Sequence, residues 1–308
     1  MADIVISEFM DESVIAEAFA GHHVLYDSGL VDQPSALNAA LADARALIVR
    51  NRTQVNTALL AHAPLLRTVG RLGVGLDNID VPACAARHIS VLPATGANDV
   101  AVAEYVITAM LVLLRRAWFA TDAVVAGTWP RMSLIGREAH GKRVGLLGLG
   151  AIARETASRA RALGMQVRAH DPHLDASHPA WSQVERVDLN ALFTDSDVIS
   201  LHVPLSRETR GLVDAARLAT MRRDAILINA ARGGIVDEIA LAAALRDGRL
   251  GGAALDVFDS EPVTAATGAR FAGVPNLLLT PHVAGVTVES NVRVSAVTAQ
   301  AVLRALRA

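Results

Sequence analysis

The sequence predicts an α/β protein made of two doubly wound parallel-sheet domains, one inserted into the other. Three observations support this prediction. Short apolar runs alternate with helical segments along almost all of the 308 residues. A glycine-rich turn, from Gly148 to Ala153, directly follows one of the apolar runs near the middle of the chain. The last helical segment, 286–306, has little of its own to pack on, so we expect the chain to return there to the first domain.

The first 97 residues contain five apolar runs separated by helical segments. Parallel strands need crossover connections, so this alternation indicates one parallel sheet with right-handed crossovers. We place this domain at 1–97 together with 286–308, and the second domain at 98–285. In the first domain, strands are expected at 4–7, 24–26, 46–49, 66–69 and 89–92, and helices at 12–20, 35–44, 56–62 and 81–87.

Two loops of the first domain follow strand ends. Gly73-Val74-Gly75-Leu76 begins one of them, and its glycines could present backbone N–H groups to an anion. An ordinary strand-to-helix loop, with Asp80 as the helix cap, is an equally good interpretation. Arg50-Asn51-Arg52-Thr53 carries two arginines in three residues. These could also bind an anion, although a solvated surface pair is the more usual explanation.

Residues 99–127 are predicted to form one long helix, with room for a break near Arg115. Asn98 or Asp99 would cap its start, and Gly127 would end it. The helix is apolar nearly all round, so we expect it to be buried, and a second subunit is one candidate for the surface that covers it. Its uncharged part is too short to span a bilayer.

The glycine-rich turn has the strand, turn and helix context of a dinucleotide-binding site. Strand 144–147 precedes the pattern G-x-G-x-x-A, and helix 151–163 follows it. Gly148 permits the tight turn, and Gly150 lets a pyrophosphate approach the backbone. The helix N-terminus offers free N–H groups and the positive end of its dipole. Alanine is tolerated at the third position, Ala153. The second domain is therefore predicted to be Rossmann-type.

The following strand, 165–170, ends at Asp171, which is the second test of that prediction. A carboxylate about twenty residues after the glycines receives the hydrogen bonds of an adenosine ribose. A loop-capping aspartate is the alternative. Asp171 would repel a 2′-phosphate, so we expect NAD rather than NADP as the cofactor. Arg168 and His173 are nearby cations that could soften this preference.

Four polar residues of the second domain come after strand ends, where ligands of open parallel sheets bind. Each of them has an ordinary structural explanation on its own, but together they form an acid–base unit. They are Arg232, Asp256, Glu261 and His282. The other elements of this domain are expected as helices at 188–193, 214–221 and 237–248 and strands at 198–203, 225–229, 253–255 and 277–279.

A hydride can pass from an alcohol carbon to nicotinamide only if the hydroxyl proton also leaves, and histidine accepts protons near neutral pH. We therefore predict that His282 is the acid/base. Glu261 would orient the ring and favour its protonated form, and Arg232 would grip a substrate carboxylate. Asp256 would contact the nicotinamide amide or support the histidine region. The backbone from Val74 to Leu76 would hold the other side of the carboxylate.

Composition excludes several classes of function. The formal net charge is −2 with no basic block, so nucleic acid is not an expected partner. The single cysteine, Cys84, cannot form an internal disulfide and is expected to be a buried small hydrophobe. The start of the sequence has no signal-like apolar run. We expect a cytoplasmic protein with no membrane partner and no metal site.

At this point the chain resembles the D-isomer-specific 2-hydroxyacid dehydrogenases, particularly the phosphoglycerate dehydrogenases, over nearly all of its length. The resemblance rests on 73–80, 148–152, 229–234, 254–258, Glu261-Pro262 and Pro281-His282. It implies a flavodoxin-like substrate domain, a homodimer formed through the long helix, and catalytic roles for Arg232, Glu261 and His282. It implies cofactor contacts at Gly148, Gly150, Ala151, Ile152, Asp171, Val203, Pro204, Ala230, Ala231, Arg232, Asp256, His282, Ala284 and Gly285.

Within that family, segments 48–55 and 96–99 are similar to the (S)-sulfolactate dehydrogenase branch. A sulfonate is a permanent anion, and Arg50, Arg52 and Arg131 are the candidates to hold it. Asn51, between the first two, is also expected to bind substrate. A 3-phosphoglycerate dehydrogenase and a hydroxypyruvate or glyoxylate reductase remain as alternatives. A catalytically silent NAD-sensing protein is the alternative from another class, and the presence of all three expected catalytic residues argues against it.

Overall fold

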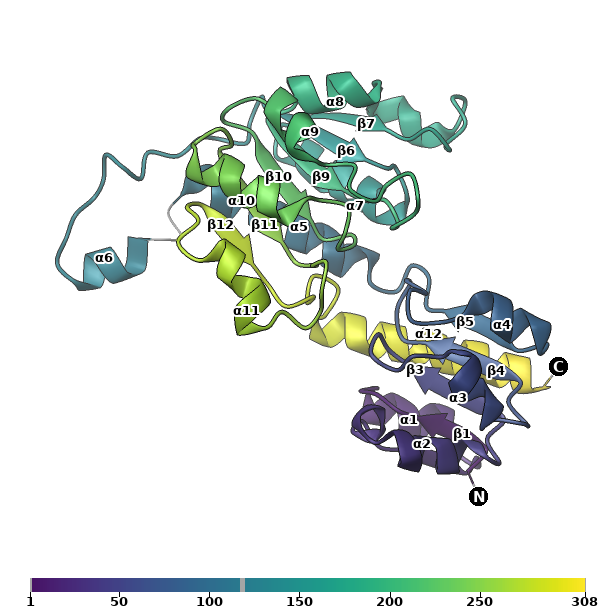
Figure 1. The fold of residues 1–308 in the computed structure, drawn as a ribbon. Helices are drawn as coiled ribbons and strands as arrows, with labels where there is room; N and C mark the ends of the chain where they lie inside the picture. Colours follow the sequence, from purple (N-terminus) through teal and green to yellow (C-terminus); the bar gives the residue numbers. More distant parts are fainter. Residues whose placement is uncertain (1, 117–119, 308) are drawn as a thin grey trace. The chain divides into compact units, whose positions relative to one another are not determined.

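The computed structural model describes residues 2–116 and 120–307. The chain divides into two compact units, which we call unit 1 (Met1–Asn98 with Val286–Ala308) and unit 2 (Asp99–Gly285). Met1 and Ala308 lie outside the described residues. Each unit is built on one parallel β-sheet covered by helices (Figure 1). This confirms the predicted fold class.

Unit 1 has a five-stranded sheet in the order β2-β1-β3-β4-β5, the flavodoxin-like order. All of its strand pairs are parallel. The strands are β1 (Ile4–Ile6), β2 (Val24–Tyr26), β3 (Ala46–Val49), β4 (Thr68–Arg71) and β5 (Ser90–Pro93). The helices are α1 (Glu12–Ala18), α2 (Pro34–Leu41), α3 (Thr57–Ala61), α4 (Val81–Ala86) and α12 (Val288–Arg307).

Successive residues of a strand point to opposite faces, so each face of this sheet has its own core. Val5 and Leu47 pack with side chains of α2, α3 and α4 on one face, where Cys84 is fully buried as predicted. Ile4 and Ile48 pack with α1 and α12 on the other face. A Cβ added at Gly70 would lie 2.7 Å from Val302, so the glycine lets α12 approach the sheet closely.

Unit 2 has a seven-stranded parallel sheet in the order β12-β11-β10-β9-β6-β7-β8. The order reverses beside β6, and ligands of open α/β sheets bind at such a reversal. The strands are β6 (Arg143–Leu147), β7 (Gln166–His170), β8 (Glu185–Arg186), β9 (Val198–Leu201), β10 (Ile226–Asn229), β11 (Gly252–Leu255) and β12 (Leu277–Leu279). The helices are α5 (Asp99–Arg115), α6 (Thr121–Val125), α7 (Ala151–Ala162), α8 (Leu189–Asp195), α9 (Ala215–Thr220), α10 (Glu238–Arg246) and α11 (Ala265–Gly268).

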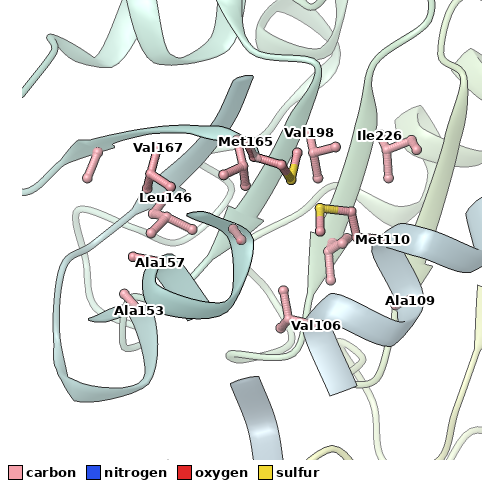
Figure 2. Close-up of a cluster of buried hydrophobic side chains, with 14 of the residues drawn as sticks. Val106, Ala109, Met110, Leu146, Ala153, Ala157, Met165, Val167, Val198 and Ile226 are labelled. Carbon is pink, nitrogen blue, oxygen red and sulfur yellow. The ribbon is translucent and has the colours of Figure 1, made fainter. Parts of the chain in front are cut away.

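One face of this sheet is covered by α5 and α7. Their small and apolar side chains pack on β6, β7, β9 and β10, as Figure 2 shows for Val106 and Met110 of α5 and for Ala153 and Ala157 of α7. The alanines leave space for helix and strand to pack closely. The opposite face is covered by α8, α9 and α10, whose buried leucines form a second cluster with the same sheet.

The helix expected at 99–127 is interrupted at Arg115, where the sequence left room for a break. α5 ends at Arg115, and a separate short helix, α6, covers Thr121–Val125. The expected helix also crosses residues 117–119, which lie outside the described residues. The segment that carries α6 extends away from the sheet of unit 2 (Figure 1). The two-residue strand β8 and the short helix α11 were not expected, because segments of that length give no measurable periodicity.

Candidate functional site

The glycine turn after β6 has the geometry that the sequence predicts. Gly148 has φ +89°, and a Cβ there would lie 2.6 Å from the carbonyl oxygen of His202, so only glycine fits. Gly150 is the N-cap residue of α7, and nothing lies within 4 Å of where its Cβ would be. The site therefore has open space beside bare backbone at the start of a twelve-residue helix.

The N-terminus of α7 has backbone N–H groups that are not hydrogen-bonded. No side chain caps this helix, and the N–H groups of Ala151 and Ile152 have no acceptor in the described part of the chain. Unsatisfied N–H groups at a helix N-terminus favour an anion. The open Gly150 and these free donors together fit the pyrophosphate of a dinucleotide.

Asp171 lies at the end of β7 and contacts the glycine turn directly. One carboxylate oxygen accepts the Leu149 N–H at 2.9 Å, and the other accepts the N–H groups of His173 and Leu174 at 3.0 and 3.2 Å. The aspartate thus caps its own loop and also lies where a ribose is expected. Arg168 is not available to a cofactor phosphate, because it is buried and pairs with Glu185 at 2.8 Å. Of these two basic side chains, only His173 is exposed.

The strands on the other side of the order reversal bring further expected cofactor residues to the same edge of the sheet. Val203 and Pro204 follow β9, and Ala230 and Ala231 follow β10. The loop after β10 is shaped by Asn229, whose side chain accepts the Ala231 N–H at 3.1 Å and donates to the Arg232 carbonyl at 2.9 Å.

His202 was not singled out by sequence reasoning. It is partly buried, and loss of contact with water lowers its pKa to about 4, so the ring is neutral near pH 7. Its Nε2 lies 2.9 Å from the Ser200 hydroxyl. Because its carbonyl oxygen faces Gly148, this residue helps to shape the glycine turn. Its position directly after β9 is the signal that could have identified it.

The three expected catalytic residues come from three adjacent strands, β10, β11 and β12, and the structure brings them together. His282 Nδ1 lies 2.7 Å from Glu261 Oε2, and Glu261 Oε1 accepts the Phe258 N–H at 2.9 Å. A Cβ at Gly233 would lie 1.8 Å from the Phe258 carbonyl oxygen, so the loop of Arg232 packs directly on the segment that leads to Glu261.

The hydrogen bonds and the positive charge around Glu261 favour its ionised form. Burial alone would raise the pKa of Glu261, but the hydrogen bonds from His282 and from the Phe258 N–H, with the charge of Arg232, keep that pKa below its ordinary value. Glu261 is therefore an anion throughout the neutral range. An anion hydrogen-bonded to Nδ1 holds the proton there and leaves Nε2 of His282 to exchange a proton with a ligand.

Asp256 supports the loop that carries His282. Its carboxylate is buried and accepts the N–H groups of Val283 and Ala284, both at 2.8 Å, and the hydroxyl of Thr280 at 2.6 Å. Sequence reasoning left two roles open for this residue, and these contacts favour the supporting one. Ala284 and Gly285 end the same loop.

The glycine loop of unit 1 is shaped by Arg71, which sequence reasoning missed. Its guanidinium donates to the carbonyl oxygens of Gly75 at 2.9 Å and Leu72 at 2.6 Å, and it fills the space beside Gly73. The carbonyls thus face a cation. The N–H groups of Val74, Gly75 and Leu76 donate to no acceptor within the described residues. This arrangement favours the anion-binding interpretation of the loop.

The other loop of unit 1, from Arg50 to Thr53, is organised by Glu8, which sequence reasoning also missed. The buried Glu8 carboxylate accepts the backbone N–H groups of all four loop residues, at 2.8 to 3.2 Å. The backbone of this loop is therefore already bound to an internal carboxylate, and only its side chains remain for a ligand.

The arginines of that loop have partners. Arg50 donates to Asn291 at 3.0 Å and lies over the Phe9 ring, and burial lowers its pKa although Glu8 opposes the shift. Arg52 forms an exposed pair with Asp32. Arg131 follows α6, and no hydrogen bond or ion pair of the described residues joins it to the cluster of His282 and Glu261. Arg50 and Arg52 share one loop of unit 1, and Arg131 belongs to unit 2.

Among residues 2–116 and 120–307, no three His, Cys, Asp or Glu side chains are placed to hold a metal ion. No helix within those ranges has the length and apolar character needed to cross a membrane.

Known proteins resemble this chain over its whole length. Residues 107–284 match the model of the D-isomer specific 2-hydroxyacid dehydrogenase NAD-binding domain. The (S)-sulfolactate dehydrogenase of Chromohalobacter salexigens is 55% identical over 307 residues, which cover 99% of each chain. The D-3-phosphoglycerate dehydrogenase of Archaeoglobus fulgidus is 39% identical over 255 residues, 83% of this chain but only 48% of that protein. The crystal structure of a D-lactate dehydrogenase from Aquifex aeolicus, complexed with NAD and lactic acid, superposes with a TM-score of 0.84 at 25% identity, covering 99% of this chain and 95% of that one.

Proposed function

This chain belongs to the D-isomer specific 2-hydroxyacid dehydrogenase family and is an NAD-dependent oxidoreductase, and we propose that Arg232, Glu261 and His282 carry out its chemistry. The observation that carries this proposal is the 2.7 Å contact between His282 and Glu261 beside Arg232. A catalytically silent NAD sensor would have no need for a charged glutamate that orients a histidine ring.

NAD, when bound, accepts or supplies the hydride at C2 of the substrate. The residues present fit this cofactor, since Gly148 and Gly150 leave the backbone bare, α7 offers free N–H groups, and Asp171 ends β7. In oxidation, Nε2 of His282 takes the hydroxyl proton, and in reduction it returns that proton to the carbonyl oxygen. Glu261 stabilises the charged ring. Arg232 binds the substrate carboxylate and polarises the oxygen on C2.

For the substrate, we propose (S)-3-sulfolactate and 3-sulfopyruvate. The support is the 55% identity to a sulfolactate dehydrogenase over the whole chain, together with the cationic loop at Arg50 and Arg52. Unit 1 is then the substrate domain, with the N–H groups of Val74, Gly75 and Leu76 at the carboxylate. 3-Phosphoglycerate and hydroxypyruvate or glyoxylate are the alternative substrates, and the first of these has a distal anion as well.

Arg52 is the better candidate than Arg50 for the distal sulfonate. Its present partner, Asp32, forms an exposed pair with it, and exposed pairs contribute only about 0–1 kcal/mol. A dianionic ligand can therefore take this guanidinium from Asp32 at little cost. Arg50 instead lies over an aromatic ring and hydrogen-bonds to α12, so its place in the loop is more structural.

We also propose a cytoplasmic homodimer formed through unit 2. The segment around α6 exposes large apolar side chains, with Val125 82%, Trp129 75% and Met132 81% exposed. Such a group of exposed apolar residues is typical of a protein interface. Sedimentation velocity tests this proposal. The wild type should sediment as a dimer and Trp129→Asp as a monomer, and a wild type that sediments as a monomer would contradict the proposal.

The experiment that tests the proposed function is a panel of small 2-hydroxy and 2-keto acids assayed with NAD(H) and NADP(H). We expect turnover with NAD(H) and a preference for the dianionic three-carbon acids. Turnover of glyoxylate or hydroxypyruvate in preference to sulfopyruvate would move the assignment to the alternative reductases.

A further inference from the structure

The loop that carries His282 is held in an unfavourable backbone conformation. His282 has φ +56°, in the left-handed region that a bulky side chain seldom adopts. A conformation of this kind persists only where the surroundings hold it. Here Asp256 does so, because its carbonyl oxygen accepts the His282 N–H at 2.8 Å and its carboxylate accepts the next two N–H groups.

The carboxylate of Asp256 is itself oriented by a chain of two hydroxyl groups. Thr280 donates to Asp256 Oδ1 at 2.6 Å, and the Thr280 oxygen lies 2.6 Å from the hydroxyl of Tyr105. A threonine has one hydroxyl proton, and Thr280 uses it on Asp256. Tyr105 must therefore be the donor to Thr280. Counting the hydroxyl protons in this way identifies the donor and the acceptor of both hydrogen bonds.

The tyrosine at the end of this chain is well suited to be a fixed donor. Burial raises the pKa of Tyr105 to about 12, so the phenol keeps its proton. It belongs to α5, whose neighbouring residues Val106, Ala109 and Met110 are buried against the sheet of unit 2 (Figure 2). A hydroxyl on a firmly packed helix is thus connected to a strained loop through a threonine and a buried aspartate.

We propose that Tyr105 is a positioning residue for His282, acting through Thr280 and Asp256 to hold the ring where it pairs with Glu261. The inference rests on the proposed function for the role of His282. It adds a residue of α5, whose hydroxyl reaches the end of β12 at Thr280, to the set that determines the rate of proton transfer. Chains of hydrogen bonds strengthen one another, so the loss of the outermost donor also weakens the inner bonds.

The test compares Tyr105→Phe, Thr280→Val, Thr280→Ser and the double variant Tyr105→Phe/Thr280→Val. Tyr26→Phe is the matched control, because the hydroxyl of this half-buried tyrosine of unit 1 makes no hydrogen bond in the described part of the chain. Three quantities are measured: kcat, the primary deuterium isotope effect of the C2-deuterated substrate, and amide hydrogen exchange of the peptide that covers 277–289 without ligand.

We expect Tyr105→Phe to lower kcat about three- to ten-fold and Thr280→Val about ten- to a hundred-fold, because the second bond is made to a charged group. The isotope effect should rise in both, and the exchange of the 277–289 peptide should become faster. Thr280→Ser and Tyr26→Phe should stay within about two-fold of the wild type in kcat. The double variant should equal Thr280→Val, since Tyr105 acts only through Thr280.

The proposal is overturned if Tyr105→Phe leaves kcat or the exchange of that peptide unchanged, or if the losses of the two single variants multiply in the double variant. The exchange measurement needs no substrate. A wild type that turns over no 2-keto acid would refute the proposed function, while the link from Tyr105 to the loop would still be tested by exchange.

Discussion

Replacing Glu261 by glutamine removes the negative charge of the side chain and keeps its size and shape. The carboxylate accepts a hydrogen bond at each oxygen, from His282 Nδ1 and from the Phe258 N–H. An amide of the same size can accept at only one position. It must either leave the Phe258 N–H without an acceptor or turn its NH₂ group towards His282, which would place the ring proton on the wrong nitrogen.

The expected loss follows from the kind of bond that is removed. A hydrogen bond to a charged group contributes about 1.5–3 kcal/mol, so kcat/KM should fall by roughly ten- to a hundred-fold in Glu261→Gln. The pKa of Glu261 lies below its ordinary value, so the carboxylate keeps its charge throughout the neutral range. The loss in Glu261→Gln should therefore be the same across that range, and the wild type should approach the variant only in acid, where Glu261 takes up a proton.

The assay is kcat/KM for oxidation and for reduction across the pH range, with Glu208→Gln as the control. Glu208 is an exposed glutamate of unit 2 whose replacement makes the same change in net charge. A kcat/KM of Glu261→Gln within about two-fold of the wild type across the neutral range would refute the role given to this residue.

Three further predictions address the other parts of the site. His282→Ala should lower kcat by about two to four orders of magnitude while NADH binding, followed by its fluorescence, changes little; wild-type turnover in this variant would eliminate the mechanism. Asp171→Ala should weaken NAD binding and relax the rejection of NADP, measured as the ratio of kcat/KM for the two cofactors; a wild type that already prefers NADP would contradict the ribose assignment. Dianionic three-carbon acids should exceed D-lactate in kcat/KM by roughly two orders of magnitude, and Arg52→Ala should remove most of that difference with little effect on D-lactate. Asp32→Asn is the matched control, and equal losses on both substrates would show that Arg52 is structural.

The fold class and the main cluster could be predicted because they depend on local patterns. Apolar runs locate strands, and the rule that ligands lie at strand ends selects Arg232, Glu261 and His282 without knowledge of any contact. Because β10, β11 and β12 are neighbours in the sheet, the residues that follow these strands are brought close together. The turn at Gly148 was predictable for the same reason, because its geometry involves consecutive residues.

The supporting residues could not be predicted in the same way, because their partners are distant in sequence. Glu8 binds the loop at 50–53, and Tyr105 reaches Thr280 across 175 positions. Arg71 was missed although it ends β4, since an arginine at a strand end gives no sign that it will bind its own loop. Strand ends identify which residues meet a ligand, whereas tertiary packing determines which residues hold them in place.

The most direct test of the central assignment is the formation of NADH, followed by its absorbance, when the purified protein is given NAD and the separate stereoisomers of lactate, glycerate, phosphoglycerate and sulfolactate. We predict NADH from acids with the D arrangement at C2, with (S)-sulfolactate the fastest, and a rate of NADH formation at least about a hundred-fold lower in the His282→Ala variant. No NADH from any of these acids, or equal rates for both stereoisomers, would contradict it.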